Sequence, residues 1–349
     1  MQLKENSATN KNVEFKLSFV NGLKEVVLKE IEKNKNIHVH RTDEDSVYIS
    51  YFETHEWVLN LKSVSKAYII SRNDRYNPSY ITSHKSIVGE LIEKVTADKK
   101  REFKTFNIMC AGSNSPEVKN INKYIESTFA LVKKEEADLK IHIIKVNNTW
   151  EVGVQISPRP LSLRSYKIEN MSGAMDPTIA YALNSECNIL NKKSYLNAFS
   201  GSATLLIEAG LEYAHLESLV GFDNNKTHLS LAIQNIKKSG LLTRITLKEK
   251  NIYDSLEFGT FDVITADLPF GMAISKGENL QKMYTQFIYF CEKSLYTDGV
   301  LAIFTNEPTL LETVIASSKF EIIKILDLKI PTNVHLYLKP KIFWCVFKK

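Results

Sequence analysis

The feature that most constrains the fold is a regular alternation of strand and helix patterns in the second half of the chain. Short apolar segments at 194–199, 219–222, 245–250, 261–268 and 299–304 have the length of strands. Amphipathic patterns at about 203–213, 225–239 and 280–295 predict helices between them. Such alternation is typical of a parallel sheet with helices on both faces. We therefore expect an α/β fold for this half.

The first half of the chain alternates shorter elements. Strands are predicted at 13–19, 47–52, 103–112, 139–146 and 149–156, and helices at 22–33, 80–95 and 116–133. Small α+β modules are implied. Residues 157–167 hold two prolines and three basic residues with little apolar periodicity, which predicts a linker between the halves.

Charge is distributed unevenly along the 349 residues, whose formal net charge is +5. Residues 1–167 hold 27 Lys and Arg against 21 Asp and Glu, whereas residues 168–349 hold 18 against 19. The basic surplus is therefore N-terminal. This distribution is consistent with a basic N-terminal half that binds a phosphate backbone and a near-neutral C-terminal half that holds a separate chemical site.

Several classes of protein are excluded by what the sequence lacks. No apolar run approaches the roughly 20 residues that span a bilayer, and the N-terminus is polar, so no membrane association and a cytoplasmic location are expected. The four cysteines form no CxxC pair, and His38 and His40 have no evident third partner, so no metal site is expected.

The first motif with chemical meaning lies in residues 196–209, LNAFSGSATLLIEA, a strand followed by a small-residue turn and a helix. Gly201, Ser202 and Ala203 would leave amide N–H groups open at a helix N-terminus, where the polar end of a nucleotide-like cofactor can bind. An ordinary strand–turn–helix connection is the alternative interpretation.

Acidic and amide side chains are predicted at the ends of the next two strands. Asp223 can accept hydrogen bonds from both hydroxyls of a ribose, although it could instead cap the helix that begins near Lys226. Asn251 follows the third strand and could face an adenine edge.

The sharpest motif is ADLPFG, residues 266–271, at the end of an apolar strand. The carboxyl ends of parallel strands meet at one edge, so Asp267 should share a crevice with the first motif. Its carboxylate and the Leu268 carbonyl could accept the two hydrogens of an exocyclic amine and aim the nitrogen lone pair at an electrophilic methyl group. Pro269 stiffens the turn and Phe270 offers a stacking face for an extruded base. A plain turn is the alternative, since Pro and Gly favour turns.

With these motifs in place, nearly the whole chain resembles the THUMP-domain RNA methyltransferases that form N2-methylguanosine, especially the tRNA branch. Residues 197–204, NAFSGSAT, stand where that family usually has D-P-F-C-G-S-G-T, and residues 267–271 match its D/N-x-P-F/Y-G motif. Asn279, Leu280 and Tyr284 extend the similarity. Residues 20–33 resemble the first helix of the family's ferredoxin-like module, and residues 136–168 resemble the end of its THUMP domain.

The resemblance implies an architecture and a set of site residues. It implies a ferredoxin-like module at 1–60, a THUMP module at 61–157, a linker at 158–175 and a class I, Rossmann-like methyltransferase domain at 176–349, with S-adenosylmethionine as cofactor. The expected catalytic residues are Asp267, Leu268, Pro269 and Phe270. The expected cofactor-binding residues are Asn197, Phe199, Ser200, Gly201, Ser202, Ala203, Thr204, Asp223, Asn224, Asn251 and Ile252. Arg159 and Arg164 are candidate RNA phosphate contacts.

Three positions depart from the family pattern. Asn197 replaces the usual Asp of the cofactor loop, Ala203 replaces a usual Gly, and Asn251 stands where many relatives carry Asp. The target-base motif is intact, which favours an active enzyme.

The resulting hypothesis is a monomeric tRNA guanine-N2 methyltransferase whose N-terminal half binds RNA. The alternatives are a methyltransferase acting on rRNA guanine or on a DNA adenine amine, and a catalytically silent RNA-binding protein.

Overall fold

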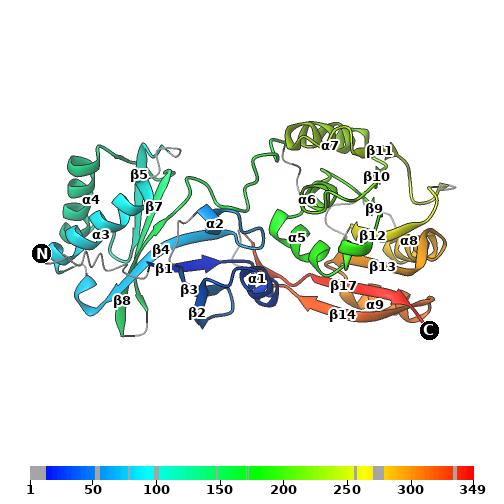
Figure 1. The fold of residues 1–349 in the computed structure, drawn as a ribbon, viewed down its shortest axis with the longest axis horizontal. Helices are drawn as coiled ribbons and strands as arrows, with labels where there is room; N and C mark the ends of the chain where they lie inside the picture. The colour runs from blue at the N-terminus through cyan, green and yellow to red at the C-terminus, as the bar shows by residue number, and fades with distance from the viewer. Residues whose placement is uncertain are drawn as a thin grey trace, which may run out of the picture. The chain divides into compact units, whose positions relative to one another are not determined.

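The structure is a computed structural model, which describes residues 13–51, 56–77, 79–97, 102–146, 148–169, 171, 173–254, 258–269, 279–332 and 336–349. The chain divides into two compact units (Figure 1). The N-terminal unit comprises Met1–Phe19 and Val27–Leu161, and the C-terminal unit comprises Val20–Val26 and Ser162–Lys349.

The N-terminal unit is built on one eight-stranded sheet with the order β2-β3-β1-β4-β8-β7-β5-β6. Its strands are β1 (Val13–Ser18), β2 (Ile37–Thr42), β3 (Ser46–Tyr51), β4 (Lys66–Asn73), β5 (Thr105–Cys110), β6 (Val132–Lys133), β7 (Leu139–Val146) and β8 (Thr149–Gln155). Its helices are α2 (Glu56–Leu59), α3 (Ile81–Thr96) and α4 (Pro116–Phe129), with a 3-10 turn η1 (Asp74–Tyr76). Helix α1 (Lys24–Ile31) is divided between the units after Val26. Because β4 pairs antiparallel with both β1 and β8, strands from residues 13–73 and 105–155 belong to a single sheet.

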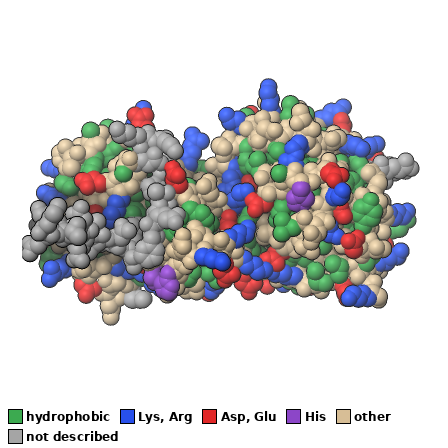
Figure 2. All heavy atoms as spheres, viewed as in Figure 1, with side chains coloured by type: hydrophobic (Ala, Val, Ile, Leu, Met, Phe, Trp, Pro, Cys, Tyr) green, Lys and Arg blue, Asp and Glu red, His purple; other side chains and the backbone are tan. Residues whose placement is uncertain are grey.

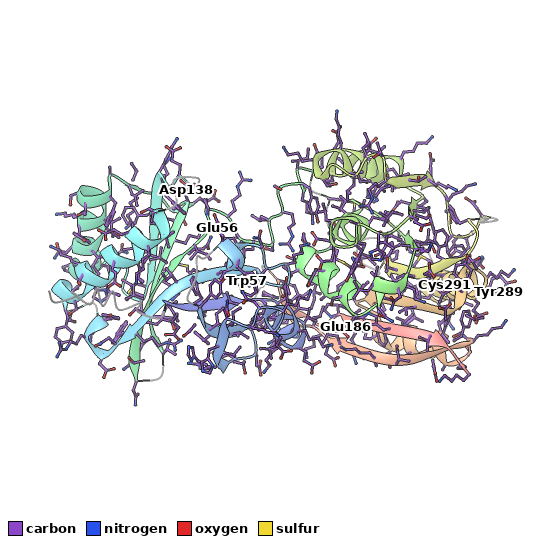
Figure 3. All side chains as sticks on the ribbon, viewed as in Figure 1. Glu56, Trp57, Asp138, Glu186, Tyr289 and Cys291 are labelled. Atoms are coloured by element: carbon purple, nitrogen blue, oxygen red, sulfur yellow. The ribbon has the colours of Figure 1, made fainter. Side chains whose placement is uncertain are left out.

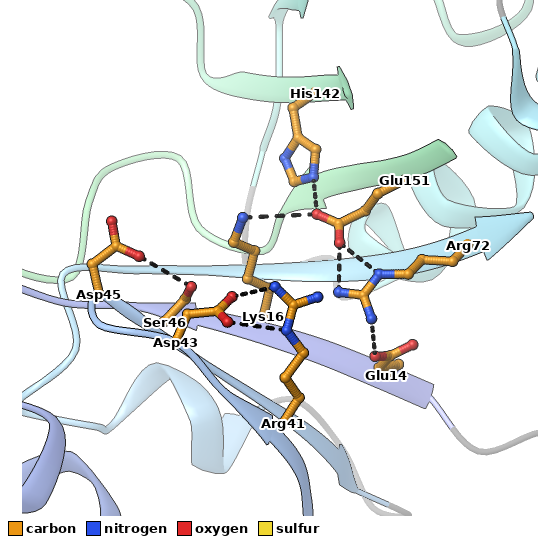
Figure 4. Close-up of polar contacts among 9 residues, drawn as sticks. All are labelled: Glu14, Lys16, Arg41, Asp43, Asp45, Ser46, Arg72, His142 and Glu151. Atoms are coloured by element: carbon orange, nitrogen blue, oxygen red, sulfur yellow. Dashed lines mark hydrogen bonds and ion pairs between the residues drawn. The ribbon is translucent and has the colours of Figure 1, made fainter. Parts of the chain in front are cut away.

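A buried ionic cluster occupies one face of this sheet (Figure 4). Glu151 is fully buried and accepts hydrogen bonds from Arg72 at 2.7 and 2.8 Å and from His142 Nε2 at 2.8 Å, with Lys16 Nζ 3.8 Å away. Burial alone would raise the pKa of Glu151, but the hydrogen bonds and charges of these neighbours outweigh it and lower that pKa to about 2. The cluster is therefore stably ionic and ties β1, β4, β7 and β8 together.

The C-terminal unit is a three-layer α/β structure around a seven-stranded sheet with the order β11-β10-β9-β12-β13-β17-β14. Its strands are β9 (Ser194–Ala198), β10 (Ser218–Asp223), β11 (Ile245–Glu249), β12 (Phe261–Asp267), β13 (Leu295–Thr305), β14 (Phe320–Asp327) and β17 (Lys341–Phe347), with a small pair β15 (Ile330–Pro331) and β16 (Tyr337–Leu338). Its other elements are α5 (Pro177–Ser185), η2 (Ile189–Asn191), α6 (Thr204–Glu212), α7 (Lys226–Ser239), α8 (Leu280–Ser294) and α9 (Pro308–Ala316).

The predicted parallel sheet is confirmed for β9 to β13, and two strands that were not predicted, β17 and β14, extend it. The strands from β9 to β13 pair in parallel, but β17 runs antiparallel to both β13 and β14. The chain turns back between β14 and β17, so the last strand enters the sheet from the opposite end.

Helix α8 buries one of its faces. On α8, Cys291 is fully buried and Tyr289 is 50% exposed; both side chains are labelled in Figure 3. Cys291 joins a core with Phe287, Leu301 and Phe343. This packing fixes α8 against β12 and β13, where the site described below begins.

The order in which strands are added to the sheet reverses at β9. From β9 the chain builds outward to β10 and β11, and it then crosses to the other side of β9 to form β12 and β13. The carboxyl ends of β9 and β12 are neighbours, with Ala198 opposite Ala266. Ligands of open α/β sheets bind at such a reversal of strand order.

Two further observations concern the described part of the chain as a whole. None of its helices has the length and apolar character needed to cross a bilayer, and none of its His, Cys, Asp and Glu side chains form a group of three placed to hold a metal ion. On the face drawn in Figure 2, the Lys and Arg side chains of the described residues are spread over both units.

Candidate functional site

A cavity of about 700 Å³ opens at the carboxyl ends of β9, β10, β11 and β12. Its volume lies in the range of small-molecule sites. Most of the predicted cofactor-binding residues line it, namely Asn197, Phe199, Ser200, Gly201, Ser202, Thr204, Asp223, Asn224, Asn251 and Ile252. Asp267, Leu268 and Pro269 line the same cavity. The two motifs that sequence analysis singled out therefore share one space.

The loop between β9 and α6 is tightly wound. Phe199, Gly201 and Ala203 have φ values of 53°, 49° and 64°, so three residues of a short loop lie in the left-handed region. The Ala203 N–H donates to the Ser200 carbonyl at 2.7 Å and closes the turn. Ala203 is fully buried beneath the cavity wall, and among the described residues no side chain caps α6. The start of α6 thus presents uncapped amide groups near the cavity.

Asp223 fixes this loop against the neighbouring strand. Its Oδ2 accepts a hydrogen bond from the Gly201 N–H and its Oδ1 accepts one from the Asn225 N–H, both at 2.9 Å. His228 Nδ1 lies 3.6 Å from Oδ1. Each carboxylate oxygen can accept a further hydrogen bond, so Asp223 can still bind a ligand hydroxyl in the cavity.

The alternative role for Asp223, capping the next helix, belongs to a neighbouring residue. The N-cap of α7 is Asn225, whose side chain accepts hydrogen bonds from the backbone N–H groups of Thr227 and His228. The helix begins at Lys226, as predicted. Asp223 therefore lines the cavity and is not the N-cap of α7.

The loop after β11 forms another part of the cavity wall. The Asn251 side chain accepts a hydrogen bond from the Tyr253 N–H at 3.1 Å, while the Asn251 N–H donates to Asp254 at 2.8 Å. Ile252 is only 3% exposed and packs into the core. Asn251 thus shapes its own turn, and Ile252 contributes an apolar patch.

The turn after β12 is held by the strand and helix behind it. The Leu268 N–H donates to the Phe304 carbonyl at 2.9 Å, and Leu268 is fully buried. The Tyr284 hydroxyl on α8 donates to the Pro269 carbonyl at 3.1 Å. These contacts fix the backbone on both sides of Pro269. Phe270 and Gly271 lie outside the described residues.

Asp267 has an altered acidity. Burial raises the pKa of its carboxyl group to about 7, and the positive charge of Lys167 lowers it in part. Perturbed carboxyl groups in a cavity mark candidate chemical sites.

Asn197 connects the two central strands at the base of the cavity. Its Nδ2 donates to the Ala198 carbonyl at 3.1 Å and to the Thr265 carbonyl at 3.2 Å. An aspartate could not donate either hydrogen bond. The Asn197 amide group, which stands where the family usually has Asp, therefore has a structural role.

Other cavity residues were missed by sequence analysis. They are Met171, Gly173, Ala174, Met175, Leu205, Phe222, Asn225, Thr227, His228, Leu231, Lys250, Tyr253 and Met283. Those from 171–175 belong to the predicted linker, whose irregular pattern gave no sign that it folds over the cavity. The positions near 225–231 could have been inferred from helical spacing, since a helix that starts at Asn225 turns one face toward the end of β10.

The two predicted RNA contacts differ in environment. Arg159 is exposed. Arg164 is largely buried, with a 14% exposed side chain, and its Nε donates to the buried Glu208 carboxylate at 3.1 Å. Tyr166 donates to the same Glu208 oxygen at 2.7 Å. Arg164 therefore fastens the linker to α6.

Comparison with known proteins agrees with this geometry. The family model described as UPF0020, RMKL-like, methyltransferase domain, matches residues 164–335. The U6 snRNA (guanine-N(2))-methyltransferase THUMPD2 of Bos taurus is 26% identical over 177 residues, which cover 50% of this chain and 33% of that protein. The tRNA (guanine(6)-N2)-methyltransferase of Thermus thermophilus is 29% identical over 161 residues, which cover 46% of this chain and 48% of that protein. The chain thus spans between a third and a half of the length of these relatives.

The fold can be compared over nearly the entire chain. The crystal structure of TrmN from Thermus thermophilus superposes with a TM-score of 0.76 at 19% identity, covering 96% of this chain and all of that one. This likeness, with the strand order around β9, confirms the expected α/β fold class. Residues 164–335 thus match the model of an RMKL-like methyltransferase domain, and the cavity lies where the strand order reverses within them.

Proposed function

We propose that this protein transfers a methyl group from S-adenosylmethionine to the exocyclic 2-amino group of a guanosine in tRNA. The observation that carries the proposal is the shared cavity, in which the Asn197–Thr204 loop and the Asp267–Pro269 turn face one space. The relatives that act on guanine N2 of tRNA and of U6 snRNA support the choice of base and of RNA.

The cavity fits the proposed cofactor. Asp223 would accept the ribose hydroxyls, Ile252 would contact the adenine, and the amide groups at the start of α6 would face the polar end of the molecule. Asn224 and Asn251 line the same region. When bound, S-adenosylmethionine supplies the electrophilic methyl group.

The chain's own contribution to the reaction is positioning. The lone pair of an exocyclic amine is conjugated with the ring, so the amine is a weak nucleophile. The Asp267 carboxylate and the Leu268 carbonyl would accept its two hydrogens and orient the lone pair toward the methyl group. Tyr284 and the Phe304 carbonyl keep this turn in place. Phe270, by its place in the motif, would stack on the base.

The N-terminal unit would bind the folded RNA as a ferredoxin-like module (1–60) followed by a THUMP module (61–157). The basic surplus of residues 1–167 supports this assignment. Arg159, which is exposed, remains the proposed phosphate contact, whereas the pair with Glu208 gives Arg164 a structural role. From the sequence we expect the protein to act as a monomer in the cytoplasm.

The variant Asp267→Ala tests the proposal. Methyl incorporation into tRNA should fall by at least about 100-fold, since an interaction made in the transition state is lost, while tRNA binding stays unchanged. Glu321→Ala, an exposed carboxylate on β14 of the same sheet, is the matched control and should keep wild-type activity. Turnover near wild type in Asp267→Ala would show that the assigned role is wrong.

The same assay distinguishes tRNA from two alternative substrates and an active enzyme from an inactive protein. Methyl incorporation is compared for tRNA, rRNA and duplex DNA, because the amine-holding motif serves guanine and adenine alike. Labelling of rRNA or DNA alone would replace tRNA as the substrate. A silent RNA-binding protein would bind tRNA but show no heat on titration with S-adenosylmethionine.

A further inference from the structure

A histidine on α7 lies beside the carboxylate that we assign to the cofactor ribose. His228 lines the cavity together with Asp223, and its Nδ1 lies 3.6 Å from Asp223 Oδ1. The His228 side chain is 35% exposed, so its ring is open to a ligand in the cavity. Sequence analysis assigned no role to His228. The two side chains therefore bring a carboxylate oxygen and a ring nitrogen to the same part of the cavity.

The hydrogen bonds of Asn225 determine which ring nitrogen of His228 carries the hydrogen. Asn225 Oδ1 accepts from the backbone N–H groups of Thr227 and His228, so the other end of this amide is its NH₂ group. That nitrogen, Nδ2, lies 3.3 Å from His228 Nε2. Because an amide NH₂ group only donates, Nε2 of the neutral ring must accept. The ring hydrogen is therefore on Nδ1, the nitrogen near Asp223.

The separation of the two side chains leaves room for a ligand oxygen. The distance of 3.6 Å between His228 Nδ1 and Asp223 Oδ1 is longer than a hydrogen bond, and no other described group accepts from Nδ1. A hydroxyl usually lies about 2.7 Å from a carboxylate oxygen and about 2.9 Å from an N–H donor. Because these two lengths together exceed 3.6 Å, one hydroxyl oxygen can contact both groups. The pair is therefore spaced for a bridging hydroxyl.

We propose that Asp223 and His228 form a clamp on one ribose hydroxyl of the cofactor, in which Asp223 accepts the hydrogen of the hydroxyl and His228 Nδ1–H donates to its oxygen. This inference rests on the proposed function and adds a specificity-determining residue to it. Asp223 Oδ1 accepts from the Asn225 N–H at 2.9 Å and can accept one further hydrogen bond. A hydroxyl both donates and accepts, whereas the C–H group of a deoxyribose does neither. The clamp therefore selects an intact ribose.

The neighbouring basic side chains are placed differently. Among the described residues, His228 is the basic side chain within 4.0 Å of the Asp223 carboxylate. Lys250 lines the cavity, but it contacts Asp223 through its backbone N–H, which donates to the Asp223 carbonyl at 3.0 Å. Lys226 lies in the same helical turn as His228, yet its side chain is 80% exposed and pairs with Glu249. Lys226 is not part of the cavity wall, so it serves as a control for charge near α7.

The test is calorimetric binding of S-adenosylhomocysteine and of its 2′-deoxy and 3′-deoxy ribose analogues to the full chain. His228→Leu should weaken binding of the parent compound roughly five- to tenfold, as expected for one lost hydrogen bond. For the analogue that lacks the clamped hydroxyl, the same substitution should change the affinity less than about twofold, because that hydrogen bond is already absent. His228→Asn should keep most of the affinity, since its amide NH₂ group can replace Nδ1–H. Lys226→Met should bind all three ligands as wild type does.

Two outcomes would overturn the clamp while leaving the proposed function intact. Equal losses for all three ligands in His228→Leu would mean a structural effect, which does not depend on a ribose hydroxyl. The second readout needs no ligand: ¹⁵N spectra of histidine-labelled protein, assigned through His228→Leu, should show the neutral His228 ring protonated at Nδ1, and protonation at Nε2 would contradict the proposal. If wild type binds none of the three ligands, the proposed cofactor itself is wrong, and the clamp fails with it.

Discussion

The hydroxyl of Tyr284 lies 3.1 Å from the carbonyl oxygen of Pro269, so the centre of α8 holds the turn that ends β12. The same hydroxyl lies 2.8 Å from Thr305 Oγ1, which accepts a hydrogen bond from the Glu307 N–H at 2.9 Å. The Tyr284 hydroxyl has one hydrogen, which it donates to the Pro269 carbonyl, so it must accept the hydrogen of the Thr305 hydroxyl. The direction of each bond in this chain is therefore fixed. The turn is thereby linked to the carboxyl end of β13.

Removal of this hydroxyl should impair catalysis without affecting the cofactor. Tyr284→Phe keeps the buried ring but leaves the Pro269 carbonyl unpaired, so we expect a loss of about 1 kcal/mol in the free energy of unfolding. The single-turnover rate of methyl transfer should fall about tenfold, because the acceptors for the amine are less well placed. The affinity for S-adenosylmethionine, measured by calorimetry, should stay within about twofold of wild type.

Tyr289→Phe provides the matched control for this experiment. Tyr289 lies on the same helix but is half exposed, with Lys293 over its ring (Figure 3). Its substitution should change neither the rate nor the stability. An equal loss of rate in both variants would assign the effect to α8 in general and refute the role of the Tyr284 hydroxyl.

Asp223 should be required for cofactor binding and for the shape of its loop. In Asp223→Asn, one carboxylate oxygen becomes an amide NH₂ group that opposes a backbone N–H, either that of Gly201 or that of Asn225. We expect the affinity for S-adenosylmethionine to fall at least about tenfold, from the lost charge-assisted hydrogen bonds. Calorimetric titration measures this.

The neighbouring strand supplies a control for Asp223. Glu249 stands opposite Asp223 in the register of β10 and β11, is half exposed, and forms a surface ion pair with Lys226 at 3.6 Å. Glu249→Gln should leave the affinity unchanged, since such pairs contribute little. Wild-type affinity in Asp223→Asn would remove Asp223 from the proposed cofactor site.

Much of the fold could be predicted because its elements carry local signals. The strands β9, β10 and β12 are short apolar runs that end in turn residues, and α7 was predicted from its periodicity at 225–239, within one residue of its observed start. Several strands were missed, among them β2 and β4. In β4 the residues Ala67–Ile70 are all buried, so the alternation that marks a strand is absent, and β2 is mostly exposed on both faces.

The parts of the site that could not be predicted depend on tertiary contacts. Asp223 and Asp267 could be inferred because each ends a parallel strand, and such ends meet at one edge. Met175 could not, because its place at the cavity depends on tertiary contacts such as the hydrogen bond from Lys167 Nζ to its carbonyl, in a segment without a regular pattern. Likewise, the residues of β17 do not indicate that this strand runs antiparallel to β13.

The left-handed backbone conformation of Ala203 predicts that glycine at this position would stabilise the folded protein. Its φ of 64° is unfavourable for any residue with a Cβ atom, by roughly 1 kcal/mol. Ala203→Gly should therefore raise the free energy of unfolding slightly, by up to about 1 kcal/mol, with part of the gain lost to the greater freedom of glycine in the unfolded chain. Urea unfolding measures it, and S-adenosylmethionine affinity should not decrease.

Ala130→Gly is the control for the backbone effect. Ala130 has a φ of 54° at the C-terminal end of α4, in the N-terminal unit. It should show a similar change in stability and no change in cofactor affinity. A loss of stability in Ala203→Gly alone would mean that the buried methyl group contributes more packing than the backbone strain costs.

Two aspartates of β12 should respond to pH in opposite directions. Burial raises the pKa of Asp267 to about 7 from the usual value of about 3.9. The folded state therefore holds this proton more tightly than the unfolded state does. The stabilising contribution is complete below about pH 4 and is lost as the pH rises toward 7. For Asp262, burial is outweighed by hydrogen bonds from Lys193 and Ser194, which lower its pKa, so its contribution is present above about pH 4 and is lost as the pH falls.

Asp267→Asn should thus be more stable than wild type at pH 8, by at most about 4 kcal/mol at 1.4 kcal/mol per pH unit, and should differ little from it at pH 4. Asp262→Asn should be less stable than wild type at pH 8, and the difference should shrink as the pH approaches 3. Urea unfolding of the three proteins across this range measures both effects. An Asp267→Asn variant whose stability tracked wild type at every pH would mean that the carboxyl group titrates normally. The energetic cost that we assign to ionising Asp267 in the folded state would then be absent.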